Sequence, residues 1–555
     1  MTVKTTRNIR RVSQILFFVI FFWLILKTNF EINFSGEGDI TLPYPVSLFL
    51  EFDPLTALGT LLATGTLYKG LLWSLVILIP TIFLGRFFCG WICPLGTLNH
   101  WISEIPSERL KRKGKSKINS NRYKKYQRIK YYIFLIFIAG SLVGTLQIGL
   151  LDPLPFLARS IGTVVLPTLH TTSLAIVTWI KSIGWPPLGD AAQYVFNILT
   201  ALILPFRQMH FHTIFSLGLF FILVLSLNRV FTRFWCRGIC PLGAMLGIFS
   251  RYAIFGLKKD ESTCDKCNLC LEHCQGADNP EIGSKWRQAE CHLCLNCQAS
   301  CPEGSLSFCF FPDHETTKTN PAPTRQVDIT RRKVLASVAG GLALFPFIRS
   351  GDAFDANPNP FLIRPPGSVE EDWFLKRCIR CGQCMRVCPN NAIHPTLMES
   401  GMEGIWTPIL IMKIGYCEPT CTLCGEVCPT GAILPMTSKE KVGDKDNPPD
   451  RIGTAFFDWG RCLPWAMGKT CLVCEEWCPT SPKAIFLREE EATDRNGNTI
   501  TIKRPYIEPD ICTGCGACEY ACPVIDKPAV YVTSVGESRS AKNQILLQRK
   551  GINKS

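Results

Sequence analysis

The sequence lacks the motifs that define several common classes of redox and hydrolytic protein. It contains no Cys-x2-Cys-His motif, which excludes covalently attached c-type haem, and no Gly-x-Gly-x2-Gly motif, which removes the usual signature of a dinucleotide-binding fold. Its residues suggest neither an acid–base pair nor an activated nucleophile. Any chemistry is therefore expected to reside in bound cofactors rather than in side-chain catalysis.

Cysteine, in contrast, is abundant. The chain has 29 cysteines, and 28 of them fall into tight local clusters, leaving Cys309 alone. A secreted disulfide-rich domain would be shorter and would lack long apolar segments. Long runs of Leu, Ile and Phe occupy roughly the first 250 residues, whereas roughly the last 200 are polar and rich in Pro, Gly and Cys. The chain therefore divides into a membrane half and a soluble half.

Four apolar segments are predicted to cross a membrane, because a spanning helix needs roughly 20 apolar residues. They are residues 12–30, 70–84, 131–151 and 211–227. Lys and Arg are concentrated at the N-terminus, between the second and third segments and after the fourth, which predicts a bacterial inner-membrane protein with both ends of this half in the cytoplasm. Two further apolar stretches, 161–180 and 191–204, either both cross or lie at the periplasmic interface.

One motif follows both the second and the fourth predicted spans. It reads Cys89-Gly-Trp-Ile-Cys93-Pro-Leu-Gly in the first copy and Cys236-Arg-Gly-Ile-Cys240-Pro-Leu-Gly in the second. Three intervening residues place both sulfurs of a copy on one side of a helical turn, so each pair is able to ligate a metal or to form a reversible disulfide. The four thiols together are also able to hold one shared cluster. Small buried cysteines used only for packing would not explain the repeat.

Two copies of Cys-x2-Cys-x2-Cys-x3-Cys come next, with the spacing of bacterial two-cluster ferredoxins, in which the fourth cysteine of each copy binds the other cluster. Zinc sites use separated Cys-x2-Cys pairs instead. Gln275 departs from the pattern, because Pro usually follows the fourth cysteine, and Cys309 is expected to be a packed thiol. One 4Fe–4S cluster is expected on Cys264, Cys267, Cys270 and Cys301, and the other on Cys274, Cys291, Cys294 and Cys297.

A linker and a twin-arginine segment separate this module from the rest. Residues 311–330 are polar and rich in Pro and Thr. Arg331, Arg332 and Lys333 then precede an apolar run, and residues 331–349 resemble a twin-arginine export signal, here internal to the chain. No clean Ala-x-Ala cleavage site follows, so the segment is expected to remain as an anchor. The alternative is that the two arginines merely flank a short helix.

Four more cysteine motifs predict four more 4Fe–4S clusters, two of them with a widened first gap. An apolar residue after most motifs is expected to keep water away from the cluster. The spacing does not decide which motifs exchange their fourth cysteines. Either the first motif exchanges with the fourth and the second with the third, or neighbouring motifs exchange in sequential pairs. The motifs are Cys378, Cys381, Cys384, Cys388; Cys417, Cys421, Cys424, Cys428; Cys462, Cys471, Cys474, Cys478; and Cys512, Cys515, Cys518, Cys522.

The basic charge of the chain does not require a nucleic-acid partner. There are 59 Lys and Arg against 45 Asp and Glu, which gives a formal net charge of +14. Each 4Fe–4S cluster with four thiolates carries a charge of about −2, so six of them would bring the loaded chain close to neutrality. Binding to nucleic acid is therefore not expected.

At this point two resemblances become apparent. Residues 1 to about 310 resemble the NapH-type membrane quinol-dehydrogenase component of the periplasmic nitrate reductase system, through the spans, both Cys-x3-Cys-Pro motifs and the double ferredoxin motif. Residues from about 328 onward resemble the NapG/MauM-type polyferredoxins, through the twin-arginine leader and the four cluster motifs. The insertion at 155–209 and the fusion of the two parts depart from the pattern.

These resemblances imply that electrons pass from the membrane quinol pool through 4Fe–4S clusters to a periplasmic reductase, such as nitrate reductase, or to a cytochrome. His210 and His212 are candidates to lie beside a quinone, although interfacial histidines more often have no such role. The rival interpretation is an assembly factor that keeps a metal or thiol centre of another respiratory enzyme reduced. The Cys-x3-Cys-Pro pairs favour assembly, whereas sixteen further cluster ligands favour sustained electron flow.

The expected fold is multi-domain. An α-helical membrane bundle of about four spans precedes a two-cluster ferredoxin-like α+β module and a four-cluster polyferredoxin α+β module.

If the first module is cytoplasmic and the second periplasmic, a hydrocarbon layer of about 30 Å separates them, and a relay at the Cys-x3-Cys-Pro sites or a mobile quinone is needed. If 334–348 does not cross, all six clusters share the cytoplasmic side. The expected divisions are 1–257, 258–310, 311–330, 331–349, 370–533 and a tail at 534–555.

Overall fold

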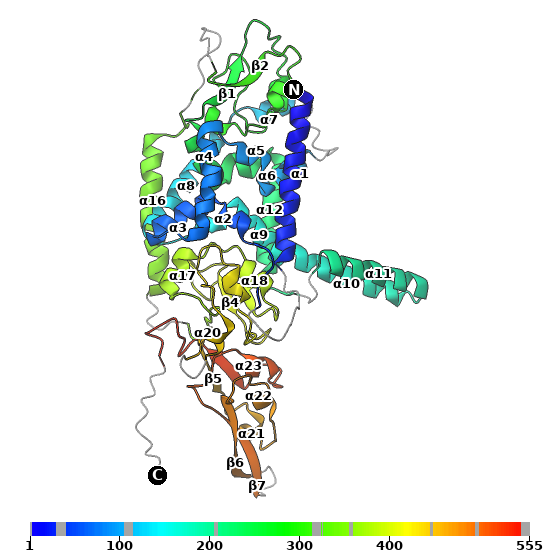
Figure 1. The fold of residues 1–555 in the computed structure, drawn as a ribbon, viewed down its shortest axis with the longest axis vertical. Helices are drawn as coiled ribbons and strands as arrows, with labels where there is room; N and C mark the ends of the chain where they lie inside the picture. The colour runs from blue at the N-terminus through cyan, green and yellow to red at the C-terminus, as the bar shows by residue number, and fades with distance from the viewer. Residues whose placement is uncertain are drawn as a thin grey trace.

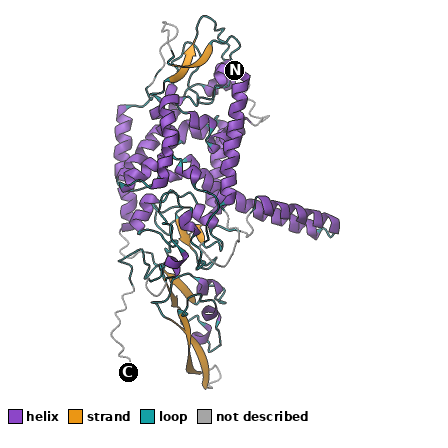
Figure 2. Ribbon diagram, in the orientation of Figure 1, coloured by secondary structure: helices purple, strands orange, loops and turns teal. Residues whose placement is uncertain are grey.

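The structure is a computed structural model that describes residues 3–28, 40–104, 115–204, 209–312, 324, 326–353, 359–443, 448–493 and 499–544. Three levels are stacked along its long axis: the first ferredoxin module, a helical bundle, and the C-terminal module (Figure 1). Helices make up most of the middle level, and the strands lie in the two outer levels (Figure 2). The two ferredoxin modules therefore contact opposite ends of the bundle.

Long apolar helices form the bundle, but four full spans are not confirmed. Within the described ranges, Arg7–Lys27 and Pro153–Ser182 are the two stretches long and apolar enough to cross a membrane. The second predicted span is a 3-10 turn, Lys69–Ser74, joined to α4 (Leu75–Leu84). The third, α8 (Ile129–Leu142), ends well before residue 151, because the chain turns at Gly144, which has a positive φ of 83°. The bundle also contains α1 (Val3–Lys27), α2 (Leu48–Glu51), α3 (Pro54–Thr64), α5 (Phe87–Trp91), α6 (Pro94–Glu104), α9 (Pro153–Ser160), α12 (Ile214–Val230) and α13 (Pro241–Ser250).

The twin-arginine segment forms one long helix of the bundle. This helix, α16 (Arg331–Ala353), is longer than the apolar run within it and packs along α8 (Figure 1). Glycines make the close approach possible: a Cβ at Gly341 would lie 2.6 Å from the Ile136 carbonyl oxygen, and a Cβ at Gly140 would lie 2.3 Å from the Phe345 ring. Small residues at such contacts are typical of helices packed within membranes.

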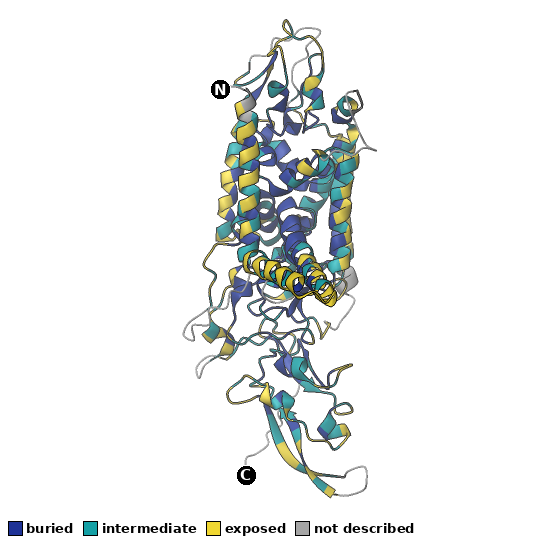
Figure 3. Cartoon of the chain, turned by 90° about the vertical axis from the view of Figure 1, so that its right-hand side faces the viewer, coloured by how far each residue is buried: buried dark blue, intermediate teal, exposed yellow. Residues whose placement is uncertain are grey.

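The insertion between the third and fourth predicted spans forms a helical hairpin. A π-helical turn, Ile161–Val165, leads from α9 into α10 (Leu166–Ser182), which packs on α11 (Pro186–Leu202). The hairpin projects sideways from the bundle, roughly across its axis, and is largely exposed (Figures 1 and 3). The geometry does not fit two additional spans parallel to α1. Its exposed apolar side chains are Leu169, Ile176, Trp179, Ile183, Trp185, Leu188, Tyr194, Val195, Ile198 and Leu202.

The first ferredoxin module is a small α+β unit. Strands β1 (Phe255–Lys259) and β2 (Leu306–Phe310) pair antiparallel, and Cys309 lies opposite Gly256 with its side chain part-exposed. Two short helices, α14 (Leu269–Glu272) and α15 (Asn296–Ala299), lie between the strands, and α7 (Lys115–Asn121) packs on α14. The strand pair closes the loop that carries all eight cysteines of this module.

The C-terminal module consists of two successive units built from short elements. The first has β3 (Ile393–Pro395) paired with β4 (Pro408–Leu410), and the second has β5 (Thr454–Phe457) paired with β8 (Val530–Thr533). A long hairpin of β6 (Ile485–Thr493) and β7 (Thr499–Ile507) extends away from the bundle (Figure 1). The helices are α17 (Glu371–Arg377), α18 (Gln383–Val387), α19 (Leu423–Glu426), α20 (Ser438–Val442), α21 (Leu463–Ala466), α22 (Val473–Glu476) and α23 (Ala517–Ala521).

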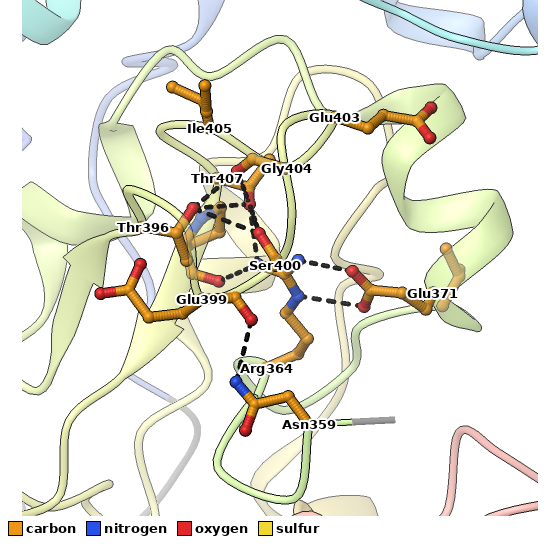
Figure 4. A network of polar contacts seen from close by, with 12 residues as sticks. Asn359, Arg364, Glu371, Thr396, Glu399, Ser400, Glu403, Gly404, Ile405 and Thr407 are labelled. Atoms are coloured by element: carbon orange, nitrogen blue, oxygen red, sulfur yellow. Dashed lines mark hydrogen bonds and ion pairs between the residues drawn. The ribbon is translucent and has the colours of Figure 1, made fainter. Parts of the chain in front are cut away.

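A buried arginine ties the first of these units together (Figure 4). The Arg364 guanidinium donates to Thr407 Oγ1 at 2.9 Å, to the Pro408 carbonyl at 2.6 Å and to the Glu371 carboxylate at 3.0 Å. Burial alone would raise the pKa of Glu371, but Arg364 and Arg539 together lower this pKa to about 2. The carboxylate therefore stays charged at neutral pH and links α17 to the strand β4.

Arg364→Met is expected to destabilise the C-terminal module. The substitution removes the charged hydrogen bonds and leaves Glu371 without its principal partner, at a cost of about 2–3 kcal/mol. Thermal unfolding of the cluster-loaded protein, followed by loss of visible absorbance, measures the effect. Lys503→Met on the exposed β6–β7 hairpin is the control, because its ion pair with Glu489 lies at the surface and is expected to contribute little. Equal unfolding temperatures for both variants would contradict the assignment.

Candidate iron–sulfur sites

The first ferredoxin module brings its cysteines together in two sets. Cys264, Cys267, Cys270 and Cys301 line one cavity. Cys274, Cys291 and Cys297 lie close enough to Cys294 to interact with it electrostatically. Both sets have the predicted membership. Burial and the neighbouring Glu281 raise the pKa of Cys270 to about 12, so a bound cationic iron core is needed to keep this thiol deprotonated.

Gln275, the departure from the usual motif, connects this module to the bundle. Its backbone carbonyl accepts a hydrogen bond from Arg237 Nε at 2.9 Å, and its side chain contacts Arg10 at 3.5 Å and His100 at 3.1 Å. Proline at this position would provide none of the side-chain contacts. The sequence pattern alone gave no indication of this role.

In the C-terminal module, neighbouring motifs exchange their fourth cysteines in sequential pairs. Cys428 lines one cavity with the first three cysteines of the first motif, and Cys388 lies beside the first three of the second. Cys522 and Cys478 exchange in the same way between the third and fourth motifs. The four sets are Cys378, Cys381, Cys384, Cys428; Cys388, Cys417, Cys421, Cys424; Cys462, Cys471, Cys474, Cys522; and Cys478, Cys512, Cys515, Cys518.

The four sets follow one another in a definite order away from the bundle. The Cys378 set contacts the bundle, since Ile379 belongs to the bundle core and Cys381 packs against it. The Cys417 set comes next, and it meets the Cys512 set where Cys417 N donates to the Cys515 carbonyl at 2.8 Å. The Cys462 set adjoins the Cys512 set through Cys474 and Cys518. It is the most distant of the four, since its helices α21 and α22 lie farther from the bundle than α23 (Figure 1).

Burial shapes the electrostatics of these thiols. It raises the pKa of Cys381, Cys421, Cys474 and Cys515 to about 12 in each case. Lys441 donates to Cys417 Sγ at 3.2 Å and to the Cys421 carbonyl at 2.6 Å. Although burial lowers the pKa of Lys441, the neighbouring thiolates raise it overall. Such donors stabilise sulfur-bound negative charge and raise the reduction potential of a cluster.

The two Cys-x3-Cys-Pro motifs form a third kind of site inside the bundle. Cys89, Cys93, Cys236 and Cys240 are all buried and lie within electrostatic range of one another. In each copy the backbone amide of the glycine in Pro-Leu-Gly donates a hydrogen bond to a cysteine sulfur. Gly96 N donates to Cys93 Sγ at 3.4 Å, and Gly243 N donates to Cys240 Sγ at 3.2 Å. In the first copy glycine is needed there, because a Cβ at Gly96 would lie 2.9 Å from the Cys89 carbonyl oxygen.

The charges around these four thiols fit an anionic cluster. Arg86 and Arg233, which act electrostatically on these thiols, are both fully buried. In the part of the chain that the structure describes, Glu290 is the one carboxylate in an ion pair with them, and it also pairs with Lys130. Burying so much unpaired positive charge is costly. A 4Fe–4S cluster with four thiolates supplies the missing negative charge.

The first ferredoxin module packs directly on this site. A Cβ at Gly90 would lie 2.2 Å from the His292 carbonyl oxygen, and Trp91 Nε1 donates to the Leu293 carbonyl at 2.9 Å. Both contacts join the first Cys-x3-Cys loop to the loop that carries Cys291 and Cys294. The four buried thiols therefore adjoin the Cys291 set without an intervening element.

Comparisons with known proteins agree with these sites. Family models of a 4Fe-4S binding domain match residues 66–113 and 211–260, which hold both Cys-x3-Cys-Pro motifs, and residues 372–394. A 4Fe-4S dicluster domain model matches residues 469–525. The ferredoxin-type protein NapG of Escherichia coli is 34% identical over 207 residues, which are 36% of this chain and 84% of NapG. The chain belongs to the NapG/MauM family of ferredoxin-type proteins.

Other members and relatives extend this result. The methylamine utilization ferredoxin-type protein MauM of Methylorubrum extorquens is 34% identical over 38% of this chain and 89% of MauM. An uncharacterized protein of Methanocaldococcus jannaschii is 28% identical over 54% of this chain and 95% of its own length. No solved structure matches. As a NapG/MauM-family member, the chain is an iron–sulfur electron-transfer protein. The NapH-type resemblance of the first half stays a prediction.

A second repeat in the bundle escaped the sequence analysis. Asp53-Pro-Leu and Asp152-Pro-Leu each precede one Cys-x3-Cys-Pro motif along the chain, and they begin α3 and α9. Both aspartates are fully buried, and Thr56 bridges them: its backbone amide donates to the Asp53 carboxylate and its hydroxyl donates to the Asp152 carboxylate. The repeated tripeptide was the available signal. The Asp53–Thr56–Asp152 contact joins the two halves of the bundle.

The candidate quinone-binding histidines, His210 and His212, lie just before the N-terminus of α12. The His212 ring contacts the His394 ring at 5.5 Å, and the His210 carbonyl accepts from Asn391 Nδ2 at 2.8 Å. Burial lowers the pKa of His394 to about 4, so this imidazole is neutral at physiological pH. The described contacts of His210 and His212 therefore join the bundle to the loop that follows Cys388.

Proposed function

We propose that the chain is a membrane-bound electron carrier that oxidises quinol at its helical bundle and passes the electrons through clusters to a redox partner protein. The arrangement that carries this proposal is a bundle with its own four-thiol site, placed between ferredoxin modules at its two ends (Figure 1). In this proposal the basic loops orient the first module toward the cytoplasm, and the C-terminal module lies on the periplasmic side. The partner would then be a periplasmic reductase, such as nitrate reductase, or a cytochrome.

In this proposal each four-cysteine set holds one 4Fe–4S cluster: six in the two modules and one at Cys89, Cys93, Cys236 and Cys240. When bound, the clusters supply one-electron redox chemistry. The residues of the chain hold the iron, exclude water, and direct amides, Lys441 and buried arginines toward the sulfurs. A site inside the bundle shortens the gap of about 30 Å that a hydrocarbon layer would otherwise place between the modules.

The burial of the bundle thiols disfavours the assembly-factor alternative. A thiol that reduces a partner protein must be reached by that partner, because disulfide exchange requires direct attack by one sulfur on another. Cys89, Cys93, Cys236 and Cys240 are all at most 9% exposed and enclosed by the bundle and the first module. They are better placed to hold a cluster than to exchange disulfides.

The direct test is reduction by quinol. Full-length protein, purified without oxygen and shown by iron analysis to be loaded, is mixed with a soluble quinol analogue and followed by EPR. The proposal expects signals of reduced clusters to appear, with dithionite as the positive control. If dithionite reduces the clusters and no quinol analogue does, the proposed donor is wrong.

The α10–α11 hairpin is expected to lie in the lipid interface. It carries only Lys181 and Asp190 as charged residues between positions 161 and 204, and its exposed Trp179, Trp185 and Tyr194 are of the type enriched at membrane interfaces. A photoreactive probe dissolved in lipid bilayers should label this hairpin. The β6–β7 hairpin, which also projects from the molecule, is the control and should stay unlabelled. Equal labelling of the two hairpins would contradict this placement.

A further inference from the structure

The junction between the bundle and the C-terminal module is formed by one cluster loop. Gly382, which follows Cys381, has a positive φ of 76°, and a Cβ there would lie 3.5 Å from Arg159 Cα. Ile379 and Cys381 pack into the bundle core. Of the four cysteine sets in this module, the one containing Cys378 and Cys381 is therefore in direct contact with α9.

Arg159 occupies the centre of this junction. It is fully buried, and its guanidinium donates to the Arg380 carbonyl at 2.7 Å and to the Leu150 carbonyl at 3.4 Å. In the described part of the chain it forms no ion pair, and the negative groups that act on it are the thiolates of Cys381 and Cys378. An unpaired buried guanidinium is unfavourable unless a nearby anion compensates it. The cluster assigned to the Cys378 set is such an anion.

A row of aromatic rings connects this junction to the thiol site inside the bundle. The Arg159 guanidinium lies over the Trp406 ring at 4.5 Å. The Trp406 ring is 5.9 Å from Phe220, and Phe220 is 6.4 Å from Trp235, the residue before Cys236. Phe156 stacks on Trp235 at 5.2 Å and fills the space beside Phe220. Each member of this row therefore contacts the next, from Arg159 to Trp235.

From these contacts we infer that electrons cross between the bundle and the C-terminal module at the cluster held by Cys378, Cys381, Cys384 and Cys428, and that Arg159 raises the reduction potential of this cluster. One electron leaves the bundle site as one reaches the cluster, with no bond or proton change. A positive charge near the sulfurs stabilises the reduced, more negative state. A higher potential at this position lets a mild donor such as quinol reduce the cluster. The inference rests on the proposed cluster assignments and not on quinol as the donor.

The test is an EPR-monitored potentiometric titration of the full-length protein, in which mediators supply electrons so that the identity of the donor does not matter. Arg159→Gln is expected to shift the midpoint potential of one cluster downward and to leave the others in place. Arg159→Lys, which keeps the charge, is expected to retain most of the wild-type value. Iron analysis confirms that all clusters are present in each variant.

Arg386 provides a matched control. It is an equally buried arginine at the same junction without an ion pair among the described residues, but its Nε bonds to the Ile25 carbonyl and no thiolate acts on its charge. Arg386→Gln should therefore leave every potential unchanged. Should Arg159→Gln fail to assemble, Trp406→Leu tests the route, because it should slow reduction of the C-terminal clusters without moving any potential. An unshifted titration in loaded Arg159→Gln, an equal shift in Arg386→Gln, or an unchanged rate in Trp406→Leu would overturn the inference.

Discussion

Cys236→Ala is expected to remove about four iron atoms from the protein and to stop quinol-driven reduction of the C-terminal clusters. The reason is that Cys236 is one of four buried thiols that the two halves of the bundle bring together. A cubane with a missing ligand deep in a bundle has no substitute nearby, and the buried arginines around it would lose their counter-charge. Iron and sulfide analysis, followed by stopped-flow absorbance after addition of quinol, measures both effects.

The same loss is expected from either half of the bundle. Cys93→Ala and Cys240→Ala should each match Cys236→Ala, because one shared cluster needs all four sulfurs. If the two Cys-x3-Cys pairs worked as separate dithiols, each variant would disable one pair and leave the iron content unchanged. Cys309→Ala is the control, since this lone cysteine lies on β2 outside every set, and it should keep its full iron content and rate. Unchanged iron content in Cys236→Ala would contradict a cluster at this site.

Cys428→Ala is expected to block electron entry into the whole C-terminal module. Although Cys428 belongs to the second motif in the sequence, it lies with Cys378, Cys381 and Cys384. Its loss should therefore destroy the cluster nearest the bundle, and the three remaining clusters of the module should stay oxidised when quinol is added. EPR after mixing with quinol measures the fraction of the remaining clusters that is reduced.

The distal set provides the comparison. Cys522→Ala should also lose about four iron atoms, because Cys522 lies with Cys462 and Cys474. The other clusters should still accept electrons from quinol, since the Cys462 set is the last in the order. If Cys428→Ala blocks electron flow and Cys522→Ala does not, although both lose the same amount of iron, the order of the clusters along the module is established. If both variants block flow equally, the order derived from the contacts is wrong.

The cysteine spacing predicted which thiols of the first module lie together, because each triplet is a local loop whose geometry depends on few other residues. The exchange of Cys274 and Cys301 in the first module follows from the same local rule, and the structure brings these thiols to the expected sets. The pairing in the C-terminal module depended instead on how distant motifs fold together. Contacts such as Cys417 N to the Cys515 carbonyl are not encoded in the spacing of either motif.

The bundle was harder to predict, because apolar runs do not mark where helices end. Gly144 ends α8 early, whereas the helix around the twin arginine continues to Ala353 through polar residues. The pairing of Gly341 with α8 depends on the absence of a Cβ, and the turn at Gly382 beside Arg159 depends on a positive φ of 76°. The sequence shows where such glycines occur but not which neighbours they face. The same limit applied to Gln275, whose contacts with Arg10 and Arg237 became evident only in the structure.

The central claim is that these cysteine sets hold 4Fe–4S cubanes, including one inside the bundle. Iron and acid-labile sulfide analysis with Mössbauer spectroscopy, on full-length protein purified without oxygen, tests it most directly. The account predicts about 28 iron atoms and a similar amount of sulfide per chain, all in cubane environments. Bound zinc, disulfides, or iron far below that amount in fully folded protein would contradict it.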